Sequence, residues 1–231
     1  MANTSNTKSA LIIGASRGLG LGLVTEYAGR GWHVTATVRR LPAPDAFAQF
    51  GQQIKTEMLD INDLAAVEAF LPRVKDQLFD VVFINAGVGG PEGKNAETVT
   101  PAEMSDLFMT NAISPVRLGY KLVPLVKPGS GILAFMTSIL GSVTLSGGTY
   151  AQLYCASKSA LNQLTRSFVA ELKANITVLS MHPGWVRTDM GGAGADIDVA
   201  TSVKGLVDVL TSKAGSHVHE YLDYRGKTIP W

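Results

Sequence analysis

Tyr154 and Lys158 are four residues apart, a spacing that puts both side chains on one face of a helix. A phenol beside an ammonium group is a proton donor near neutral pH if its pKa falls below the free value of about 10. A lysine cation about 4 Å away, at an effective dielectric constant of about 20, contributes roughly 4 kcal/mol to this effect. We therefore expect Lys158 to lower the pKa of Tyr154 and to make Tyr154 a general acid and base.

Ser138 follows an apolar run, 132–137, that has the pattern of a buried strand. A hydroxyl group at the end of that strand can hold a substrate oxygen atom. The Tyr-x-x-x-Lys pair is common by itself, and its alternative interpretation is an ordinary surface pair on a helix. Other motifs along the chain decide between these interpretations.

A glycine-rich stretch lies between a short apolar run, Leu11–Ile13, and a helical pattern that continues to about Arg30. Its glycines are Gly14, Gly18 and Gly20, in the spacing Gly-x-x-x-Gly-x-Gly. Glycines at such a corner let the backbone approach a ligand, and the amino end of a helix offers free amide groups to a phosphate. A glycine-rich turn without a ligand is the alternative, but the position between a strand and a helix favours a phosphate site.

The second predicted strand, His33–Val38, ends in Arg39 and Arg40 without an acidic residue. An acidic residue at this point binds the free 2′-hydroxyl group of a ribose, whereas arginine accommodates a 2′-phosphate. Arg17 in the glycine-rich stretch adds another cation nearby. These residues predict NADP rather than NAD as the cofactor; the alternative is that Arg39 and Arg40 are solvated at a strand end.

Asn111 lies inside a helix that Thr100 and Glu103 are expected to begin as a capping box, with Pro101 at the first helical position. Pro115, four residues after Asn111, removes the amide group that would bond to the Asn111 carbonyl oxygen and crowds that oxygen. We therefore expect an irregular turn around Asn111.

Strand-like and helical patterns alternate along the whole chain. This alternation predicts an α/β doubly wound (Rossmann) fold with about seven parallel strands and helices on both faces. The predicted strands are Leu11–Ile13, His33–Val38, Ile54–Leu59, Asp80–Ile84, Gly131–Thr137, Ile176–Met181 and His217–Leu222, and the shorter predicted helices include Leu64–Phe70 and Val199–Leu210. The ligand crevice is expected at the carboxyl ends of the strands, where the motifs fall.

The 231 residues suffice for one α/β domain, which we expect at residues 8–231 after a flexible segment at residues 1–7. A formal net charge of +1, without a long basic run, gives little support to a nucleic-acid partner. No apolar stretch approaches the length of a membrane span, and the single cysteine, Cys155, fits a reducing cytoplasm. We therefore expect a cytoplasmic protein without a membrane, nucleic-acid or metal partner.

Together, the glycine spacing, Asn111, Ser138 and the Tyr-x-x-x-Lys pair resemble the short-chain dehydrogenase/reductase family, from the glycine-rich stretch to the end of the chain. The stretch Asn85–Gly87 is similar to the family's Asn-Asn-Ala-Gly, with Ile84 in place of the first asparagine. The His-Pro-Gly-Trp-Val-x-Thr stretch from His182 and the final Ile-Pro-Trp resemble one branch, which holds C-factor signalling proteins and Sniffer-type carbonyl reductases.

The resemblance implies reversible hydride transfer between a nicotinamide and a small carbonyl or alcohol substrate. In this scheme Ser138 holds the carbonyl oxygen and Tyr154 gives the proton, while Lys158 lowers the tyrosine pKa and binds the nicotinamide ribose. Asn111 anchors a proton-relay water. The implied cofactor contacts are Gly14, Ser16, Arg17, Gly18, Leu19, Gly20, Arg39, Asp60, Ile61, Asn85, Ala86, Gly87, Tyr154, Lys158, Pro183, Gly184, Val186 and Thr188.

Several assignments keep an alternative. Asp60 and Ile61 are implied to hold the adenine; a helix cap is the alternative, since Asn62 and Asp63 open the predicted helix, and both roles are compatible. We expect Cys155 to have a packing role and His182 to be a structural histidine. Substrate-binding loops are expected at Gly87–Val99, Ser142–Tyr150 and Asp189–Asp198, the last being mobile and closing over substrate.

At the level of function, the alternative is a dinucleotide-binding signalling or sensor protein with little turnover. A sugar-nucleotide epimerase or dehydratase also uses Tyr-x-x-x-Lys, but the chain lacks the extra substrate domain of those enzymes. The family resemblance further implies a homodimer or homotetramer.

Overall fold

The computed structural model describes residues 7–148 and 150–231, so the segment predicted to be flexible at residues 1–7 lies outside the described residues except for Thr7. One sheet of seven parallel strands has the order β3-β2-β1-β4-β5-β6-β7. The strands are β1 (Ser9–Ile13), β2 (His33–Val38), β3 (Ile54–Met58), β4 (Val81–Ile84), β5 (Ile132–Met136), β6 (Thr177–His182) and β7 (His219–Asp223). The strand order reverses between β1 and β4, which confirms the predicted doubly wound fold.

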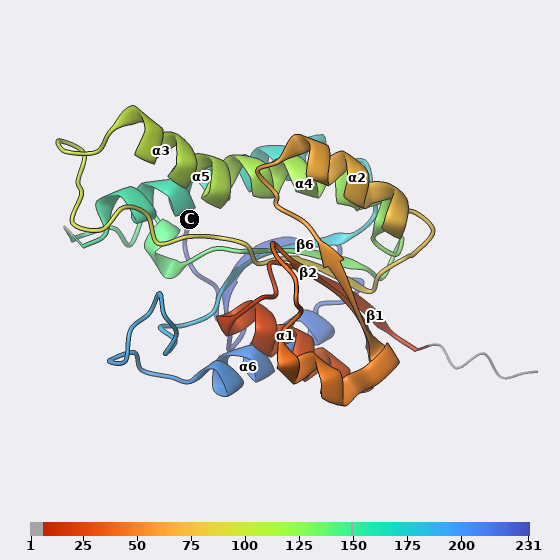
Figure 1. Ribbon diagram of the computed structural model, residues 1–231. Helices are drawn as coiled ribbons and strands as arrows, with labels where there is room; N and C mark the ends of the chain where they lie inside the picture. The colour runs from red at the N-terminus through yellow and green to blue at the C-terminus, as the bar shows by residue number, and fades with distance from the viewer. Residues whose placement is uncertain (1–6, 149) are drawn as a thin grey trace, which may run out of the picture.

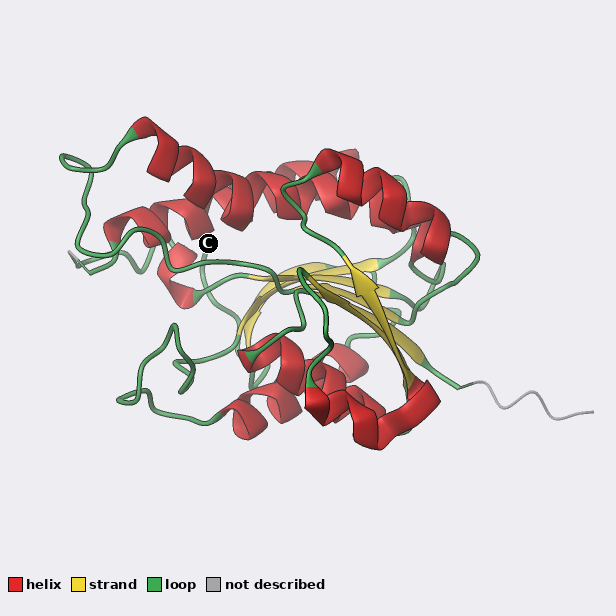
Figure 2. Ribbon diagram, viewed as in Figure 1, coloured by secondary structure: helices red, strands yellow, loops and turns green. Residues whose placement is uncertain are grey.

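Helices cover both faces of the sheet (Figures 1 and 2). One face carries α1 (Gly18–Gly29) and α6 (Val199–Ser212), and the other carries α2 (Leu64–Val74), α3 (Pro101–Phe108), α4 (Ser114–Leu122) and α5 (Gln152–Glu171). Among the described residues, none of these helices has the length and apolar character needed to cross a bilayer.

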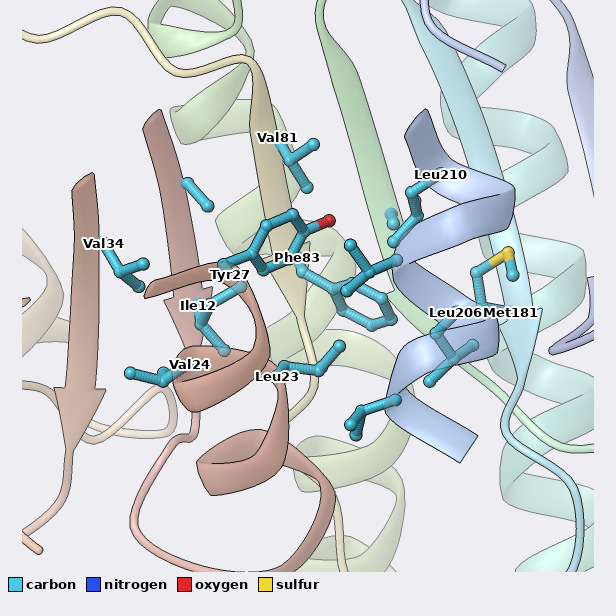
Figure 3. Close-up of a cluster of buried hydrophobic side chains, with 14 of the residues drawn as sticks. Ile12, Leu23, Val24, Tyr27, Val34, Val81, Phe83, Met181, Leu206 and Leu210 are labelled. Atoms are coloured by element: carbon cyan, nitrogen blue, oxygen red, sulfur yellow. The ribbon is translucent and has the colours of Figure 1, made fainter. Parts of the chain in front are cut away.

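The apolar strands are explained by this double cover. In β1, Ala10 and Ile12 belong to the core beneath α1 and α6, whereas Leu11 and Ile13 belong to the core beneath α2, α4 and α5. Because both faces are covered, β1 is an unbroken apolar run rather than an alternating one. Figure 3 shows the first core, where Ile12 of the sheet faces side chains of α1 and α6.

Most elements differ from their predicted bounds by a few residues, and two differences have a visible backbone cause. A 3₁₀ segment, η1 (Asp45–Gln53), lies between β2 and β3 and was not predicted; Gly51 inside it has a φ of +51°, which interrupts any regular pattern. The seventh strand begins at His219 rather than at His217, because His217 has a φ of +54° and cannot extend the strand.

The irregular turn predicted around Asn111 is present as a π-helical turn, η2 (Met109–Ile113), between α3 and α4. Thr100 and Glu103 form the predicted capping box at the start of α3. The turn is therefore a local consequence of Pro115, which stands in the first turn of α4.

Candidate active site

The predicted site residues lie in loops at the carboxyl ends of the strands. The glycine-rich stretch follows β1, Asn85 follows β4, and Ser138 follows β5. Because the strands are parallel, these loops share one edge of the sheet. α5 brings Lys158 to the same edge, where a Cβ atom built on Gly87 would lie 3.3 Å from Lys158 Nζ.

Gly14 and Gly20 hold the glycine-rich stretch, α1 and the end of β4 in direct contact. Gly14 has a φ of +86°, and a Cβ atom there would lie 2.9 Å from Ala86 Cα. A Cβ atom on Gly20 would lie 2.0 Å from the Gly14 carbonyl oxygen, which accepts a hydrogen bond from Asn85 Nδ2 at 2.8 Å. This backbone cradle, residues 14–20, therefore has no room for a side chain at Gly14 or Gly20, and such close backbone packing is typical of a turn that binds a dinucleotide phosphate.

The amino end of α1 faces this cradle. α1 begins at Gly18, and none of the described side chains caps it. The free amide groups and the helix dipole there favour an anion. Arg17 and Ser16 are exposed beside it, while Leu19 is half-buried. Arg17 Nη1 forms an ion pair with Asp189 Oδ2 at 2.7 Å, and both side chains are largely exposed.

Arg39 and Arg40 are exposed where β2 ends. Asp60 is half-buried after β3, and its Oδ1 accepts a hydrogen bond from the Asn62 amide at 2.9 Å. Asp63, not Asp60, caps α2. The helix-cap alternative for Asp60 is therefore wrong, and the neighbouring Ile61 is buried.

Asn111 joins three elements. Its Nδ2 donates hydrogen bonds to the Val88 carbonyl oxygen at 2.8 Å and to Ser157 Oγ at 3.0 Å, and its Oδ1 accepts one from the Val88 amide at 2.8 Å. The side chain is fully buried. The π-helical turn η2 thus ties the loop after β4 to α5, next to Gly87 and Lys158.

Tyr154 and Lys158 lie on the same face of α5, as their spacing predicts. The Lys158 ammonium nitrogen is 5.7 Å from the centre of the Tyr154 ring. It also donates a hydrogen bond to the Met136 carbonyl oxygen at 3.0 Å, at the end of β5. The Lys158 side chain is buried, whereas Tyr154 is half-buried.

Burial controls the pKa of both groups. Desolvation raises the pKa of Tyr154 to about 12, and a hydrogen bond with the Ser138 side chain opposes this only in part. Desolvation also lowers the pKa of Lys158 to about 8. The expectation that Lys158 holds the pKa of Tyr154 below its free value is therefore wrong for this structure, because the loss of hydration outweighs the hydrogen bond with Ser138.

Ser138 is buried two residues after the end of β5. Its Oγ accepts a hydrogen bond from the Leu140 amide at 3.2 Å, which begins the 3₁₀ turn η4 (Ile139–Gly141). The Ser138 carbonyl oxygen accepts a hydrogen bond from the Tyr221 hydroxyl group. Both polar groups of Ser138 are thus held at the crevice edge, with the side chain beside Tyr154.

The loop after β6 closes the site near α1. The Pro183 carbonyl oxygen accepts a hydrogen bond from Ser202 Oγ at 2.6 Å, and Gly184 has a φ of +85°. Val186 is buried, and Thr188 Oγ1 accepts a hydrogen bond from the Gly191 amide at 3.1 Å. A Cβ atom on Gly18 would lie 3.6 Å from Thr188 Cγ2, so this loop meets the glycine-rich stretch.

Cys155 and His182 lack the character of catalytic groups. Burial raises the pKa of the Cys155 thiol, whose Sγ donates to the Tyr150 carbonyl oxygen at 3.4 Å. Burial lowers the pKa of His182 to about 4, and among the described residues its Nδ1 has no hydrogen-bond partner. Neither group is a nucleophile or a base near neutral pH, as expected from the sequence.

Three further polar residues were missed by the sequence analysis. Ser157 bonds Asn111, Tyr221 bonds Ser138, and Asn162 Nδ2 donates to the Gly141 carbonyl oxygen at 3.1 Å. Asn162 stands four residues after Lys158, so the helical spacing alone could have found it. No sequence signal points to Tyr221, because it lies in β7, 83 residues from Ser138.

Comparison with known proteins defines the class of this protein. A family model described as short chain dehydrogenase matches residues 8–196, which is more than half of the chain. The chain therefore belongs to the short-chain dehydrogenase family. C-signal of Myxococcus xanthus is 36% identical over 170 residues, which cover 71% of this chain and 100% of that protein.

Solved structures extend the similarity over nearly the whole chain. A short-chain dehydrogenase/reductase from Burkholderia multivorans with bound NADP is 38% identical, has a TM-score of 0.93, and is matched over 97% of this chain and 100% of that one. A carbonyl reductase from Pseudomonas aeruginosa PAO1 in complex with NADP is 36% identical, with a TM-score of 0.90 over 98% and 100% of the two chains.

Carbonyl reductase Sniffer of D. melanogaster is 30% identical, with a TM-score of 0.80 over 98% and 100% of the two chains. Together with C-signal and the Pseudomonas enzyme, it supports the branch of the family that the sequence resembles.

Proposed function

We propose that the chain is an NADP(H)-dependent oxidoreductase that interconverts a carbonyl compound and the corresponding alcohol. The observation that carries this proposal is the meeting of Tyr154 and Lys158 beside Gly87, whose neighbour Ala86 packs against Gly14 of the cradle. The Lys158 nitrogen lies 5.7 Å from the Tyr154 ring and would lie 3.3 Å from a Cβ atom on Gly87. Residues 8–231 would act as one dinucleotide-binding and catalytic domain.

The residues at the cradle fit a nicotinamide dinucleotide. Gly14 and Gly20 allow close backbone packing that a Cβ atom would block, and a Cβ atom on Gly87 would crowd Lys158 Nζ at 3.3 Å. Arg17 and Arg39 are exposed cations beside the cradle and would hold a 2′-phosphate. The NADP-bound relatives from Burkholderia and Pseudomonas support the same choice of cofactor. When bound, the cofactor supplies or accepts the hydride.

The proposed cofactor contacts extend beyond these glycines and arginines. Asp60 and Ile61 would hold the adenine, and Val186 with Thr188 would hold the carboxamide group. The proposed set also includes Ser16, Gly18, Leu19, Asn85, Ala86, Tyr154, Lys158, Pro183 and Gly184.

Four side chains have proposed catalytic roles, and two of these roles depend on protonation states. Ser138 would hold the substrate oxygen and stabilise the charge that develops on it. With a pKa of about 12, Tyr154 is protonated at neutral pH and is ready to give a proton to an alkoxide. Lys158 is charged below about pH 8 and would stabilise the tyrosinate that remains. Asn111 would anchor the water that returns the proton to the site.

Exposed apolar side chains favour a neutral substrate. Two loops beside Ser138 and the end of β6 carry large apolar side chains that are more than half exposed: Val143, Leu145, Tyr150, Trp185 and Met190. A neutral apolar aldehyde, ketone or quinone would remove such surfaces from water, whereas an anionic substrate would gain little from them.

A substrate panel tests the proposal. The absorbance of the nicotinamide is followed with aldehydes, ketones and quinones, each with NADPH and with NADH. We expect turnover with NADPH and a preference over NADH of at least about tenfold, since charge-assisted hydrogen bonds to the 2′-phosphate supply that discrimination. Arg39→Ala should reduce the preference. Turnover that is equal with the two cofactors would contradict the NADP assignment.

The alternative, a dinucleotide-binding signalling protein with little turnover, is not favoured, because the side chains proposed for catalysis are all present. In the same assay, binding of NADPH without turnover of any substrate would support that alternative. On the family resemblance we also propose that the protein is cytoplasmic and forms a homodimer or homotetramer. Sedimentation of the purified protein tests the oligomeric state.

A further inference from the structure

The wall segment (Ser138–Leu145) carries the serine proposed to hold the substrate oxygen, and it contains only one short 3₁₀ turn, η4. Its Ser142 is buried, while Val143 and Leu145 are 70% and 52% exposed. A segment with so few internal backbone hydrogen bonds depends on its neighbours for a fixed position. Its contacts therefore decide how well Ser138 is oriented.

α5 holds the inner side of the wall segment. Asn162 Nδ2 and Ser159 Oγ both donate hydrogen bonds to the Gly141 carbonyl oxygen, each at 3.1 Å. Gly141 also packs closely, since a Cβ atom there would lie 2.9 Å from the Lys158 carbonyl oxygen. These contacts fix η4 against α5, and the residues that follow η4 are held mainly by other elements.

β7 and the closing segment (Thr228–Trp231) hold the wall segment on both sides of η4. The buried Tyr221 of β7 donates its hydroxyl hydrogen to the Ser138 carbonyl oxygen. Ser142 Oγ donates to the Pro230 carbonyl oxygen at 2.6 Å. The Thr144 amide and Oγ1 both donate to the Trp231 backbone oxygen, at 3.1 and 2.6 Å.

The closing segment is itself anchored. The Ile229 amide donates to the Tyr221 carbonyl oxygen at 2.8 Å, and the Ile229 side chain is buried. The Trp231 ring centre lies 5.1 Å from that of Tyr221 and 4.9 Å from that of His219. The Arg166 guanidinium group lies 5.3 Å from the Trp231 ring, a cation–π contact from α5.

We propose that Tyr221 and Trp231 are positioning residues that set the orientation of Ser138 and the shape of the apolar substrate wall. This inference rests on the proposed function, because it concerns the serine that would bind the substrate oxygen. Tyr221 acts on the peptide of Ser138, and Trp231 acts through Thr144 on the residues that follow η4. A displacement of about 1 Å at such a site reduces turnover by up to about a hundredfold.

Tyr221→Phe is the first test, because it keeps the ring and its packing and removes only the hydroxyl group. We expect kcat/KM for the carbonyl panel to fall by about tenfold or more, from loss of orientation. The Kd for NADPH, measured by fluorescence titration, should stay within about twofold, since the glycine-rich stretch follows β1 and three strands separate β1 from β7 in the sheet. Tyr27→Phe is the matched control.

Tyr27 suits this control because it is a fully buried tyrosine of α1, and its hydroxyl group has no hydrogen-bond partner among the described residues. Figure 3 shows it in the core on the α1 side of the sheet. Tyr27→Phe should therefore leave kcat/KM unchanged. An unchanged kcat/KM in Tyr221→Phe, or a fall matched by equal loss of NADPH affinity, would overturn the positioning role.

Trp231 has its own pair of variants. Trp231→Ala should raise KM more than it lowers kcat, because the wall loosens while the catalytic groups stay in place. Trp231→Phe keeps an aromatic ring against Tyr221 and Arg166 and should restore most of the wild-type KM. Equal KM values in Trp231→Ala and the wild type would refute the role of Trp231.

Amide hydrogen exchange tests, without an activity assay, whether Tyr221 and Trp231 hold the wall segment in place. In Tyr221→Phe and Trp231→Ala, exchange at the Gly141, Ser142 and Thr144 amides should accelerate by about tenfold, since lost hydrogen bonds weaken local stability. Exchange at Ile12 in β1 should not change. If no carbonyl compound is turned over by the wild type, the proposed function fails and the catalytic role fails with it. If the wild type turns over carbonyl compounds but exchange is unchanged in both variants, only the proposed positioning role of Tyr221 and Trp231 is refuted.

Discussion

Tyr154 and Lys158 both lose hydration in the folded protein, and this sets the chemistry available to each side chain. Burial keeps the proton on the phenol and weakens the hold of the amine on its own proton. At neutral pH both groups are protonated, which is the state that proton donation in carbonyl reduction requires. Tyr154 is therefore protonated before the reaction begins, and the Lys158 ammonium group is present to stabilise the tyrosinate that proton donation leaves.

Tyr154→Phe removes the proposed acid and leaves its ring. We expect kcat to fall by about 10²- to 10⁴-fold, the range for loss of a general acid, while the affinity for NADPH persists. Stopped assays with the preferred substrate and fluorescence titration of NADPH measure the two quantities. Tyr120→Phe is the control, because Tyr120 donates only to Glu171 on the outer surface of α4 and α5. Unchanged turnover in Tyr154→Phe would exclude the assigned role.

The pH dependence of reduction follows from Lys158. Its pKa of about 8 means that the side chain is charged below that pH and loses the proton as the pH rises through it. Tyr154 stays protonated over the same range. The reduction kcat/KM should therefore decline above about pH 8, as the cation that stabilises the tyrosinate is lost.

Lys158→Arg keeps a positive charge at high pH. Its activity will be lower in absolute terms, but the decline above about pH 8 should disappear from its profile. A wild-type profile that is flat from about pH 6 to about pH 10 would show that Lys158 does not titrate in catalysis.

At the scale of elements, α1 rests on the loops after β1 and β4 through glycine contacts rather than through side chains. Gly20 and Gly29 belong to the same helix but differ completely in their surroundings. A Cβ atom on Gly20 would overlap the Gly14 carbonyl oxygen at 2.0 Å, whereas none of the described atoms lies within 4 Å of one on Gly29. The contact that positions the cofactor cradle is therefore specific to one end of the helix.

Gly20→Ala should destabilise the fold by about 3 kcal/mol or more, because a backbone oxygen cannot yield as a side chain does. Gly29→Ala should instead stabilise it by about 0.5 to 1 kcal/mol, since alanine loses less backbone entropy in a helix. Urea denaturation followed by circular dichroism measures both. Similar stabilities for the two variants would contradict the tight packing at Gly20.

At the scale of the whole molecule, two partly buried histidines connect stability to pH. Burial lowers the pKa of His182 and of His219 to about 4, from an ordinary value of about 6.5 in the unfolded chain. Between these values the unfolded state binds more protons than the folded state. The free energy of unfolding must then fall as the pH falls from about 6.5 towards about 4.

We expect the melting temperature to drop on the order of a few degrees between about pH 7 and about pH 5, above the range where carboxylates titrate. His182→Gln and His219→Gln should each reduce that drop. His33→Gln is the control, because His33 is exposed at the start of β2. If the drop is the same in all three variants as in the wild type, the two histidines are not its cause.

The sequence by itself determined the succession of strands and helices along the chain. Double burial makes each strand an apolar run, and each motif follows a strand end. It also determined the Tyr154–Lys158 face and the turn at Asn111, because helical spacing and the missing amide of Pro115 act over a few residues. These features depend only on residues that are close together in the sequence.

Only the tertiary structure decided the direction of the Tyr154 pKa shift and the contact between Tyr221 and Ser138. The first depends on how many atoms exclude water from the phenol, which spacing along one helix does not measure. The second joins Tyr221 in β7 to Ser138 in the loop after β5, 83 positions apart in the sequence. Burial and long-range contact are properties of the packed chain, and they set the protonation and orientation on which the proposed chemistry depends.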